Sequence, residues 1–317
     1  MDIALAQQAD QAWPALTDAA AFRAYFEREG YIVVRNALPP ALCAEAVDAF
    51  LTEIHLDHRA LFLRQAPSRY AAHTYTAAGH MQHPIVNLQD LCPRRYPQFR
   101  AAALALLTDG VLRRAVETLL GAPARLLDSM YFDATQIPWA QRDDRGIDAV
   151  RPDAMVGAWI AAEDAQAGAG RFYVLPRSHL RPASCWRGAA HGGGARGHGD
   201  GDGAAAAEFA AHETPRQAAP LLQQGDLLLW SATTVHGSLP STSAASSRRA
   251  LCGHYSAAAA PAAVTTRLGG IDIVHHNDPR SLAGRAANLL RAQYPGAYLL
   301  WRRLARLPPP ADPGAPK

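Results

Sequence analysis

The 317-residue sequence predicts a mainly β protein with flanking helices, built as a sandwich or a double-sheet jelly roll. Three observations lead to this fold class. Helical patterns occur in the first 121 residues. After Gly121, short apolar segments of strand length follow one another, and turn residues separate them. Hydrophobic residues make up 49% of the chain, which is enough for a sizeable core.

The first part of the chain is predicted to form a helical lead-in that contains one strand. In chain order we expect a helix over Phe22–Glu29, a strand over Tyr31–Val34, a helix from Pro40 and a helix from Asp109 to Gly121. Gly30 and Gly121 stand where helices usually end, and Asp109 is a typical N-cap residue. The segment Leu56–Pro97 shows no clear pattern and contributes several histidines.

The second part of the chain is predicted to supply the β core. The expected strands are Arg125–Phe132, Met155–Ala161, Arg171–Leu175, Asp226–Trp230, Ala250–Tyr255 and Val264–Leu268. We therefore expect a single domain over residues 1–307, with the lead-in over 1–121 and the β core over 122–268. A Gly-rich insertion over 188–215 interrupts the core, and a Pro-rich, disordered tail over 308–317 follows the domain.

Composition excludes several classes of protein. The net charge is +3, from 31 basic and 28 acidic residues without a dense basic block, so we expect no nucleic-acid partner. No run of eighteen apolar residues occurs, and the N-terminus lacks a basic signal region, so we expect a soluble, cytoplasmic protein. The four cysteines form no CxxC pair, which argues against a disulfide framework and a cysteine zinc site. The sequence does not predict an oligomeric state.

The residues that could form a catalytic site lie close to His236 in the sequence. A Gly-Asp turn leads into the apolar strand that ends at Trp230, and His236 follows six residues later. Arg248 and Arg249 then begin the next strand. A His after one core strand and an Arg before the next would meet at the same mouth of a β-barrel. Neutral imidazole suits Fe(II), and a guanidinium can hold a carboxylate bidentately.

Three motifs in this order resemble the phytanoyl-CoA dioxygenase family of Fe(II)/2-oxoglutarate oxygenases, over about Phe22–Tyr255. The first motif comprises Phe26, Gly30, Tyr31, Val33 and Leu38. The second comprises Trp159, Ile160, Ala161, Asp164, Gly170, Val174, Pro176, Ser178 and His179. The third comprises Gly225, Asp226, His236, Gly237, Ser238, Pro240, Arg248, Arg249 and Ala250.

The resemblance implies a double-stranded β-helix, the cupin-like jelly roll, with iron held by two His and one carboxylate. It implies an oxygenase that hydroxylates or otherwise oxidises a small organic molecule, with succinate and CO2 as co-products. In this sequence Asp143 and His236 would hold Fe(II), and Arg248 would bind 2-oxoglutarate. Arg248 lies about one residue further from His236 than the family pattern expects, so Arg249 is a rival. Strand alternation allows only one of the two to face inward.

The sequence departs from the family at the first iron ligand. When Asp143 is aligned with the family's Asp, Gln141 stands where the His belongs, and no histidine lies between His83 and His179. Gln141 could offer an amide oxygen in its place. Loop Asp residues are otherwise mostly turn formers, so a solvated turn is the alternative interpretation of Asp143.

Because this histidine is missing, the sequence is compatible with more than one class of function. The leading hypothesis is the oxygenase. The alternative is a catalytically silent jelly roll that binds a ligand or a partner, and a redox-neutral or non-iron metal enzyme is a third. For the other candidates we expect Trp159 in the core, His179 as a structural hydrogen-bonding residue and His275-His276 on a loop surface. His73, His80 and His83 would border the substrate entrance or lie on an exposed loop.

Overall fold

The computed structural model describes residues 12–64, 69–134, 140–143, 155–181, 217–243, 245–257, 265–276 and 281–304. The predicted insertion over 188–215 and the predicted tail over 308–317 lie outside the described residues. The helices of the lead-in are α2 (Ala19–Glu29), α3 (Pro40–Ala49) with its π-helical continuation η1 (Phe50–Ile54), α4 (Pro97–Leu107) and α5 (Gly110–Leu120). Near the C-terminus lie α7 (Leu282–Gln293) and α8 (Pro295–Leu304), and 3-10 turns occur at η2 (Leu88–Asp90) and η5 (Ser178–Leu180).

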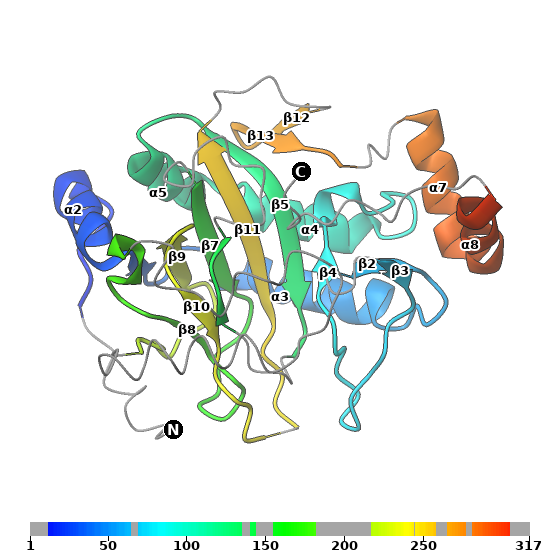
Figure 1. Ribbon diagram of the computed structural model, residues 1–317, viewed down its shortest axis with the longest axis horizontal. Helices are drawn as coiled ribbons and strands as arrows, with labels where there is room; N and C mark the ends of the chain where they lie inside the picture. The colour runs from blue at the N-terminus through cyan, green and yellow to red at the C-terminus, as the bar shows by residue number, and fades with distance from the viewer. Residues whose placement is uncertain are drawn as a thin grey trace.

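The strands form a large and a small sheet (Figure 1). In spatial order the large sheet comprises β1 (Tyr31–Val34), β9 (Leu227–Ser231), β7 (Met155–Ala161), β11 (Ala250–Ala257), β5 (Ala124–Phe132), β13 (Ile271–Val274) and β12 (Thr265–Leu268), with β4 (Ile85–Val86) also paired to β5. The small sheet comprises β6 (Ala140–Gln141), β10 (His236–Ser238) and β8 (Phe172–Val174). The strands β2 (Phe62–Arg64) and β3 (Arg69–Ala71) pair with each other as a separate two-stranded sheet.

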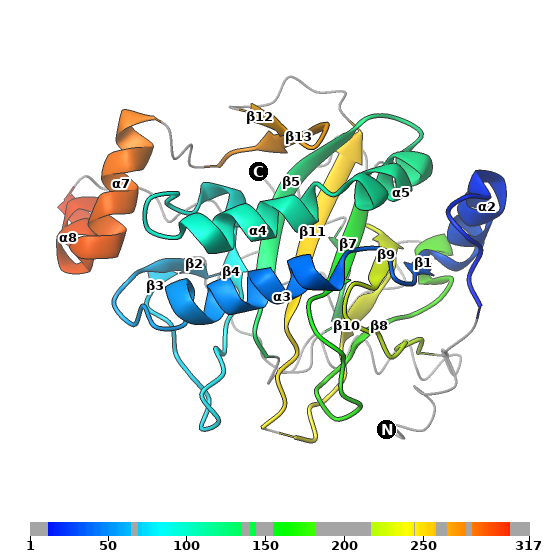
Figure 2. The same cartoon turned by 180° about the vertical axis from the view of Figure 1, so that it is seen from behind.

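The central strands of the large sheet are buried on both faces, and their side chains alternate between two cores. On β7, Val156, Ala158 and Ile160 pack with the helices of the lead-in, while Trp159 and Ala161 face the small sheet. Figure 2 shows α3, α4 and α5 crossing the outer face of this sheet. Period-two alternation explains the division, because successive side chains of a strand point to opposite faces. The inner core between the sheets is where a site can form.

Sequence reasoning predicted the lead-in and the β core, and the fold class is confirmed. The strand bounds of β1 and β7 agree with the predicted ones, and Asp109 caps α5 by accepting a hydrogen bond from the Val111 amide. Gly30 and Gly121 end their helices with positive φ angles, which glycine adopts without strain. The strands of the large sheet extend beyond the predicted core of 122–268, through β1 on one side and β13 on the other.

Three of the α-helices in the described parts of the chain were not predicted. The helix α4 reads Pro-Gln-Phe-Arg-Ala-Ala-Ala-Leu-Ala-Leu-Leu and buries apolar side chains on most of its circumference, so it lacks the one-sided pattern that reveals a surface helix. The helices α7 and α8 lie beside the β2–β3 hairpin, at the end of the molecule opposite α2 (Figure 1).

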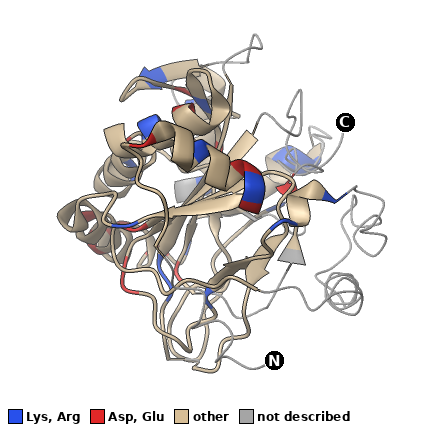
Figure 3. Ribbon diagram, turned by 90° about the vertical axis from the view of Figure 1, so that its left-hand side faces the viewer, with Lys and Arg blue, Asp and Glu red and all other residues tan. Residues whose placement is uncertain are grey.

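The distribution of charge agrees with the absence of a basic block in the sequence. On the side of the molecule seen in Figure 3, basic and acidic segments of the ribbon are interspersed. Among the described residues, no helix combines the length and the apolar character that crossing a bilayer requires.

Candidate functional site

The candidate site is centred on Asp143, whose carboxylate is buried between the two sheets with 4% of the residue exposed. Its position is fixed from the backbone, because the Asp143 amide donates to the carbonyl of Ala232 at 2.9 Å. Two residues earlier, Gln141 lies on β6 directly opposite His236 on β10. The pairing of these short strands therefore brings Gln141, Asp143 and His236 together, although 95 residues separate the first from the last.

One carboxylate oxygen of Asp143 faces the residues that the sequence singled out. Oδ1 lies 3.5 Å from Nε2 of His236 and accepts a hydrogen bond from the Gln141 side-chain amide at 3.1 Å. The same amide lies 3.5 Å from Nε2 of His236. The Nδ1 atom of His236 lies 3.0 Å from the Thr234 carbonyl, an acceptor, so Nδ1 carries the proton and Nε2 keeps its lone pair.

The other oxygen of Asp143 is held by two residues that sequence reasoning missed as site residues. Oδ2 accepts a hydrogen bond from the indole of Trp230 at 2.8 Å and lies 3.3 Å from Nε2 of His254. His254 in turn is bound through Nδ1 to Asp128 on β5, at 2.6 Å. Asp128, His254 and Asp143 thus form a continuous buried chain across the inner face of the large sheet.

Burial and charge act in opposite directions on this cluster. Burial raises the pKa of the Asp143 carboxyl, but the imidazoles of His236 and His254 outweigh it and hold that pKa well below its usual range. Burial lowers the pKa of His236, with Asp143 opposing it. For His254, burial is outweighed by Asp128 and Asp143, so its pKa lies well above the ordinary value. At neutral pH His254 is therefore an imidazolium beside Asp128 and Asp143. His236, with its lowered pKa, is neutral there and gains the proton that opposes protonation of Asp143 only in acid.

The two candidate arginines have different partners. Arg248 is 3% exposed and donates to the Ser238 hydroxyl at 2.5 Å and to the Gly170 carbonyl at 2.6 Å. Burial lowers its pKa to about 9, so it stays charged at neutral pH. Arg249, which lines the same small cavity as Arg248, is held by Asp133 at 3.0 Å and Glu163 at 3.1 Å.

Aromatic rings fill the inner core between Arg248 and the Asp143 cluster. The guanidinium carbon of Arg248 lies 4.8 Å from the centroid of the Trp159 ring. Trp159 is stacked on Phe172 at 4.6 Å, and Phe172 is stacked on the imidazole of His236 at 5.5 Å. The cavity beside Arg248 has a volume of only about 20 Å³, which is room for about one water molecule. A larger occupant requires these rings to move.

The donor set fits a metal ion in part. Across the described residues, no three His, Cys, Asp or Glu side chains are grouped so as to hold one metal ion. A metal at Oδ1 of Asp143 would have His236 as its second ligand and the amide of Gln141 as its third donor. A half-turn of that amide presents its oxygen, since the two ends of the group have the same shape. One imidazole, one carboxylate and one amide oxygen form a weaker set for Fe(II) than two imidazoles and a carboxylate.

The remaining sequence candidates have clear positions. Trp159 is in the core, and His179 hydrogen-bonds the Glu27 carbonyl at 2.9 Å, both as expected. The expectation of a surface position for His275 is wrong, because it is 4% exposed and bound to Asp90. His73 is buried and stacked on Phe62 at 4.1 Å.

Comparisons with known proteins bear on the family and the fold of the chain. The phytanoyl-CoA dioxygenase (PhyH) family model matches residues 26–250. No protein with a curated description matches the chain in sequence.

Among solved structures, the epimerase SnoN in complex with Fe3+, α-ketoglutarate and nogalamycin RO has a TM-score of 0.54 at 19% identity, over 80% of this chain and 88% of that one. EctD from S. alaskensis with 2-oxoglutarate and 5-hydroxyectoine has a TM-score of 0.51 at 18% identity, over 81% of each chain. The non-heme monooxygenase ThoJ, in its nickel complex, has a TM-score of 0.52 at 15% identity, over 90% and 98%. At these identities the likeness establishes the fold.

Proposed function

Because the chain belongs to the phytanoyl-CoA dioxygenase family, we propose that it is an Fe(II)- and 2-oxoglutarate-dependent oxygenase acting on a small organic molecule. The observation that carries the proposal is the meeting of Asp143 and His236, 3.5 Å apart, with the Gln141 amide beside both. Iron and 2-oxoglutarate, when bound, supply the oxidising chemistry. The balance is R–H + 2-oxoglutarate + O2 → R–OH + succinate + CO2.

In this proposal the protein's own groups have separate tasks. Asp143 and His236 hold the metal, and Gln141 supplies an amide oxygen or leaves that position to water. Trp230 and His254 hold Oδ2 of Asp143, so that Oδ1 is turned toward His236. The aromatic rings of the inner core exclude bulk water from the site, as oxidative chemistry requires.

Arg248 is the group that we assign to the distal carboxylate of 2-oxoglutarate. It is buried and charged, and its Ser238 and Gly170 contacts fix it inside the core. Arg249 already has two carboxylate partners in Asp133 and Glu163, so it has less to offer a third.

The direct test is an anaerobic titration of the protein with Fe(II) and 2-oxoglutarate, followed in the visible range for the charge-transfer band, and then a succinate assay in air. We expect a band and succinate from the wild-type protein. The variant Arg248→Gln should bind Fe(II) but lose the band, whereas Arg249→Gln should keep it. A band that is lost in Arg249→Gln and kept in Arg248→Gln would contradict the assignment.

A second function, that of a non-catalytic ligand-binding or interaction protein, has specific support in the ring contacts from Arg248 through Trp159 and Phe172 to His236. These rings leave room for about one water molecule beside Arg248. If the rings stay closed, 2-oxoglutarate binds neither to the wild-type protein nor to Arg248→Gln, and no succinate forms. The variant Phe172→Leu distinguishes the two cases, because a smaller side chain should restore binding of 2-oxoglutarate to an occluded site.

A further inference from the structure

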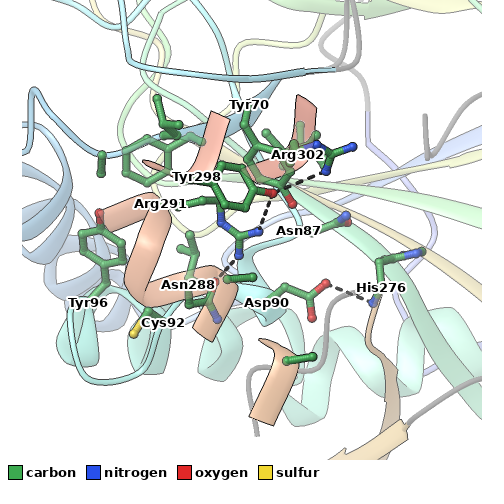
Figure 4. A pocket seen from close by; sticks show the side chains of 18 of the residues that line it. Tyr70, Asn87, Asp90, Cys92, Tyr96, His276, Asn288, Arg291, Tyr298 and Arg302 are labelled. Atoms are coloured by element: carbon green, nitrogen blue, oxygen red, sulfur yellow. Dashed lines mark hydrogen bonds between the residues drawn. The ribbon is translucent and has the colours of Figure 1, made fainter. Parts of the chain in front are cut away.

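A second cavity lies between the C-terminal helices and the strands next to them, and we call it the α7 pocket. It has a volume of about 310 Å³ and is lined by α7, α8, the β2–β3 hairpin and the β4–η2 segment (Figure 4). None of Gln141, Asp143, His236 and Arg248 lines it. Its volume is in the lower range of sites that hold small organic molecules.

Two buried polar atoms in the wall of the α7 pocket have no hydrogen-bond partner in the part of the chain that the structure describes. They are Oδ1 of Asn87 and Nδ2 of Asn288, and each residue is 6% exposed. An unsatisfied buried amide group costs free energy, so native proteins rarely keep one without a reason. One acceptor and one donor, on two walls of the same cavity, indicate a ligand that supplies the missing donor and acceptor.

The orientation of the Asn288 amide is fixed by its neighbour. Its Oδ1 accepts a hydrogen bond from the guanidinium of Arg291, which has only donors to offer. The opposite end of the amide is therefore Nδ2, a donor, and the ligand atom that meets it must be an acceptor. Figure 4 shows Asn288 and Arg291 together on the α7 wall of the pocket.

Asn87 has an uncommon backbone conformation, and its side chain makes no hydrogen bond that caps the turn next to it. Its φ angle is +58°, which is uncommon outside glycine, and its backbone amide donates to the Ser129 carbonyl on β5 at 2.7 Å. It precedes the 3-10 turn η2, where an Asn side chain commonly caps the backbone, yet its side chain makes no capping bond. Backbone strain of this kind clusters at ligand sites.

The other polar groups of the α7 pocket make it cationic. The guanidinium of Arg291 lies between two tyrosine rings, 4.5 Å from that of Tyr70 and 5.4 Å from that of Tyr298. Arg302 lies one turn beyond Tyr298 and donates to its hydroxyl at 3.4 Å.

The acid that faces these arginines in the pocket wall, Asp90, is bound by Nδ1 of His275 at 2.9 Å and by the backbone amide of His276 at 3.0 Å. Among the described residues that line the cavity, two guanidiniums thus face one carboxylate, which already has its partners. This balance favours an anionic ligand.

We propose that the α7 pocket binds an aromatic carboxylate that also carries a hydrogen-bond donor, and that this class of acid is the organic substrate. The binding of such an acid is inferred from the pocket alone, and its role as the substrate rests on the proposed function. The connection is structural, because Leu63 and Val86 line the pocket and also belong to the inner core with Trp159. Val86 is paired with Met130 on β5, two residues from Asp128.

The binding test uses the full chain in EDTA, so that it does not depend on a metal. The probes are 4-hydroxybenzoate, 4-hydroxyphenylacetate and 4-hydroxycinnamate, each compared with its uncharged carboxamide by isothermal titration calorimetry. We expect at least one acid to bind at least about tenfold more tightly than its amide, since a charged hydrogen bond is lost in the amide.

Three variants and one control locate the site. Asn288→Asp keeps the acceptor for Arg291 but replaces the donor with a negative charge, and Arg302→Gln removes a positive charge. Each should weaken binding of the acid at least about tenfold. Asn87→Gly keeps the backbone angle, which glycine accepts, and should weaken binding roughly fivefold. The control Arg303→Gln changes the same charge on an exposed neighbour of Arg302 and should leave the affinity unchanged.

The outcomes separate the two halves of the proposal. If none of the acids binds, or if they bind equally to the wild-type protein and to folded Asn288→Asp and Arg302→Gln, the pocket assignment is overturned. With Fe(II), 2-oxoglutarate and air, the acid that binds should raise succinate release, and the pocket variants should abolish the rise. If the acid binds and the protein releases succinate at the same rate with and without it, only the substrate role is overturned. Binding without any succinate would overturn the proposed function and leave the ligand site standing.

Discussion

The Nε2 atom of His254 lies 3.3 Å from Oδ2 of Asp143, on the opposite carboxylate oxygen from the one that faces His236. This contact explains how a buried carboxylate keeps a fixed orientation beside Gln141, the residue that the sequence resemblance places where the family has its first histidine. Trp230 donates to the same Oδ2, so two donors hold one oxygen and leave the other directed at the candidate metal position. The arrangement depends on Asp128, which binds His254 from behind.

We therefore predict that Asp128→Asn weakens metal binding by about 10- to 100-fold, the usual effect of losing a group that orients a ligand. The substitution loosens the hold of His254 on Asp143 and also removes a negative charge near the site. The measurement is a titration with Co(II), followed by visible absorption. A suitable control is Asp90→Asn, which affects a buried His–Asp pair away from the candidate site, with His275, and should leave Co(II) affinity unchanged. Equal losses in both variants would contradict the prediction.

The substitution Gln141→His should raise the affinity for Co(II) and Fe(II) at least about tenfold. Gln141 is paired with His236 across the small sheet, so an imidazole at this position would complete a set of two His and one carboxylate. The matched variant Gln141→Leu removes the amide donor and should bind metal more weakly than the wild-type protein. If all three proteins bind metal equally, residue 141 does not face the metal and the site proposed here is wrong.

The sequence motifs predicted which segments come together at the candidate site, but they could not predict the partners of Asp143. His254 lies at an even spacing from Arg248, on a strand that was predicted, so alternation alone would have turned it inward. Its partner depends on register. The register that pairs Ala250 with Phe132 also places Asp128 opposite His254, and a bulge shifts the pairing only beyond them, at Leu127. No local pattern in the sequence encodes that register. An inward-facing His next to a predicted metal site was the available signal.

The α7 pocket could not be predicted from the sequence, because it too depends on contacts between distant segments. Asn87 and Asn288 lie about two hundred residues apart, and each is an unremarkable residue in its own segment. Their meeting requires α7 and α8 to pack against the β2–β3 hairpin, and the amphipathic pattern of those helices does not specify the surface that they cover. Long-range docking of this kind is decided by shape and by which polar groups are left without partners.

Gly157→Ala should destabilise the fold and disturb the site together. A Cβ atom at position 157 would lie 2.2 Å from Cε2 of the Trp230 indole, so the ring must move away and lose its bond to Asp143. Overpacking of this kind costs about 1–3 kcal/mol. Urea unfolding measures the loss, and the Co(II) titration should show weaker binding in the folded variant. The control Gly296→Ala has nothing within 4 Å of the new Cβ and should lose no stability.

Acid should weaken the part of the fold that Asp57 holds together. Its carboxylate accepts hydrogen bonds from Arg95 at 2.6 Å and from Tyr96 at 2.7 Å. Burial raises the pKa of Asp57, but these bonds outweigh it, and the pKa lies below the ordinary value. In the unfolded chain Asp titrates near pH 3.9, roughly as in model peptides. The ionised form is therefore favoured by folding, and its contribution is complete above about pH 5 and declines as the pH falls through the lower, folded pKa.

The measurement is the free energy of unfolding in urea, from pH 7 to pH 2, for the wild-type protein and Asp57→Asn. The difference between the two should be constant from pH 7 to about pH 5 and should shrink below about pH 4, since a protonated Asp57 resembles Asn. Asp272→Asn serves as the control, because its partner Arg267 is largely exposed and such a pair contributes little. A difference for Asp57→Asn that grows on acidification would show that the carboxyl is favoured by folding in its protonated form.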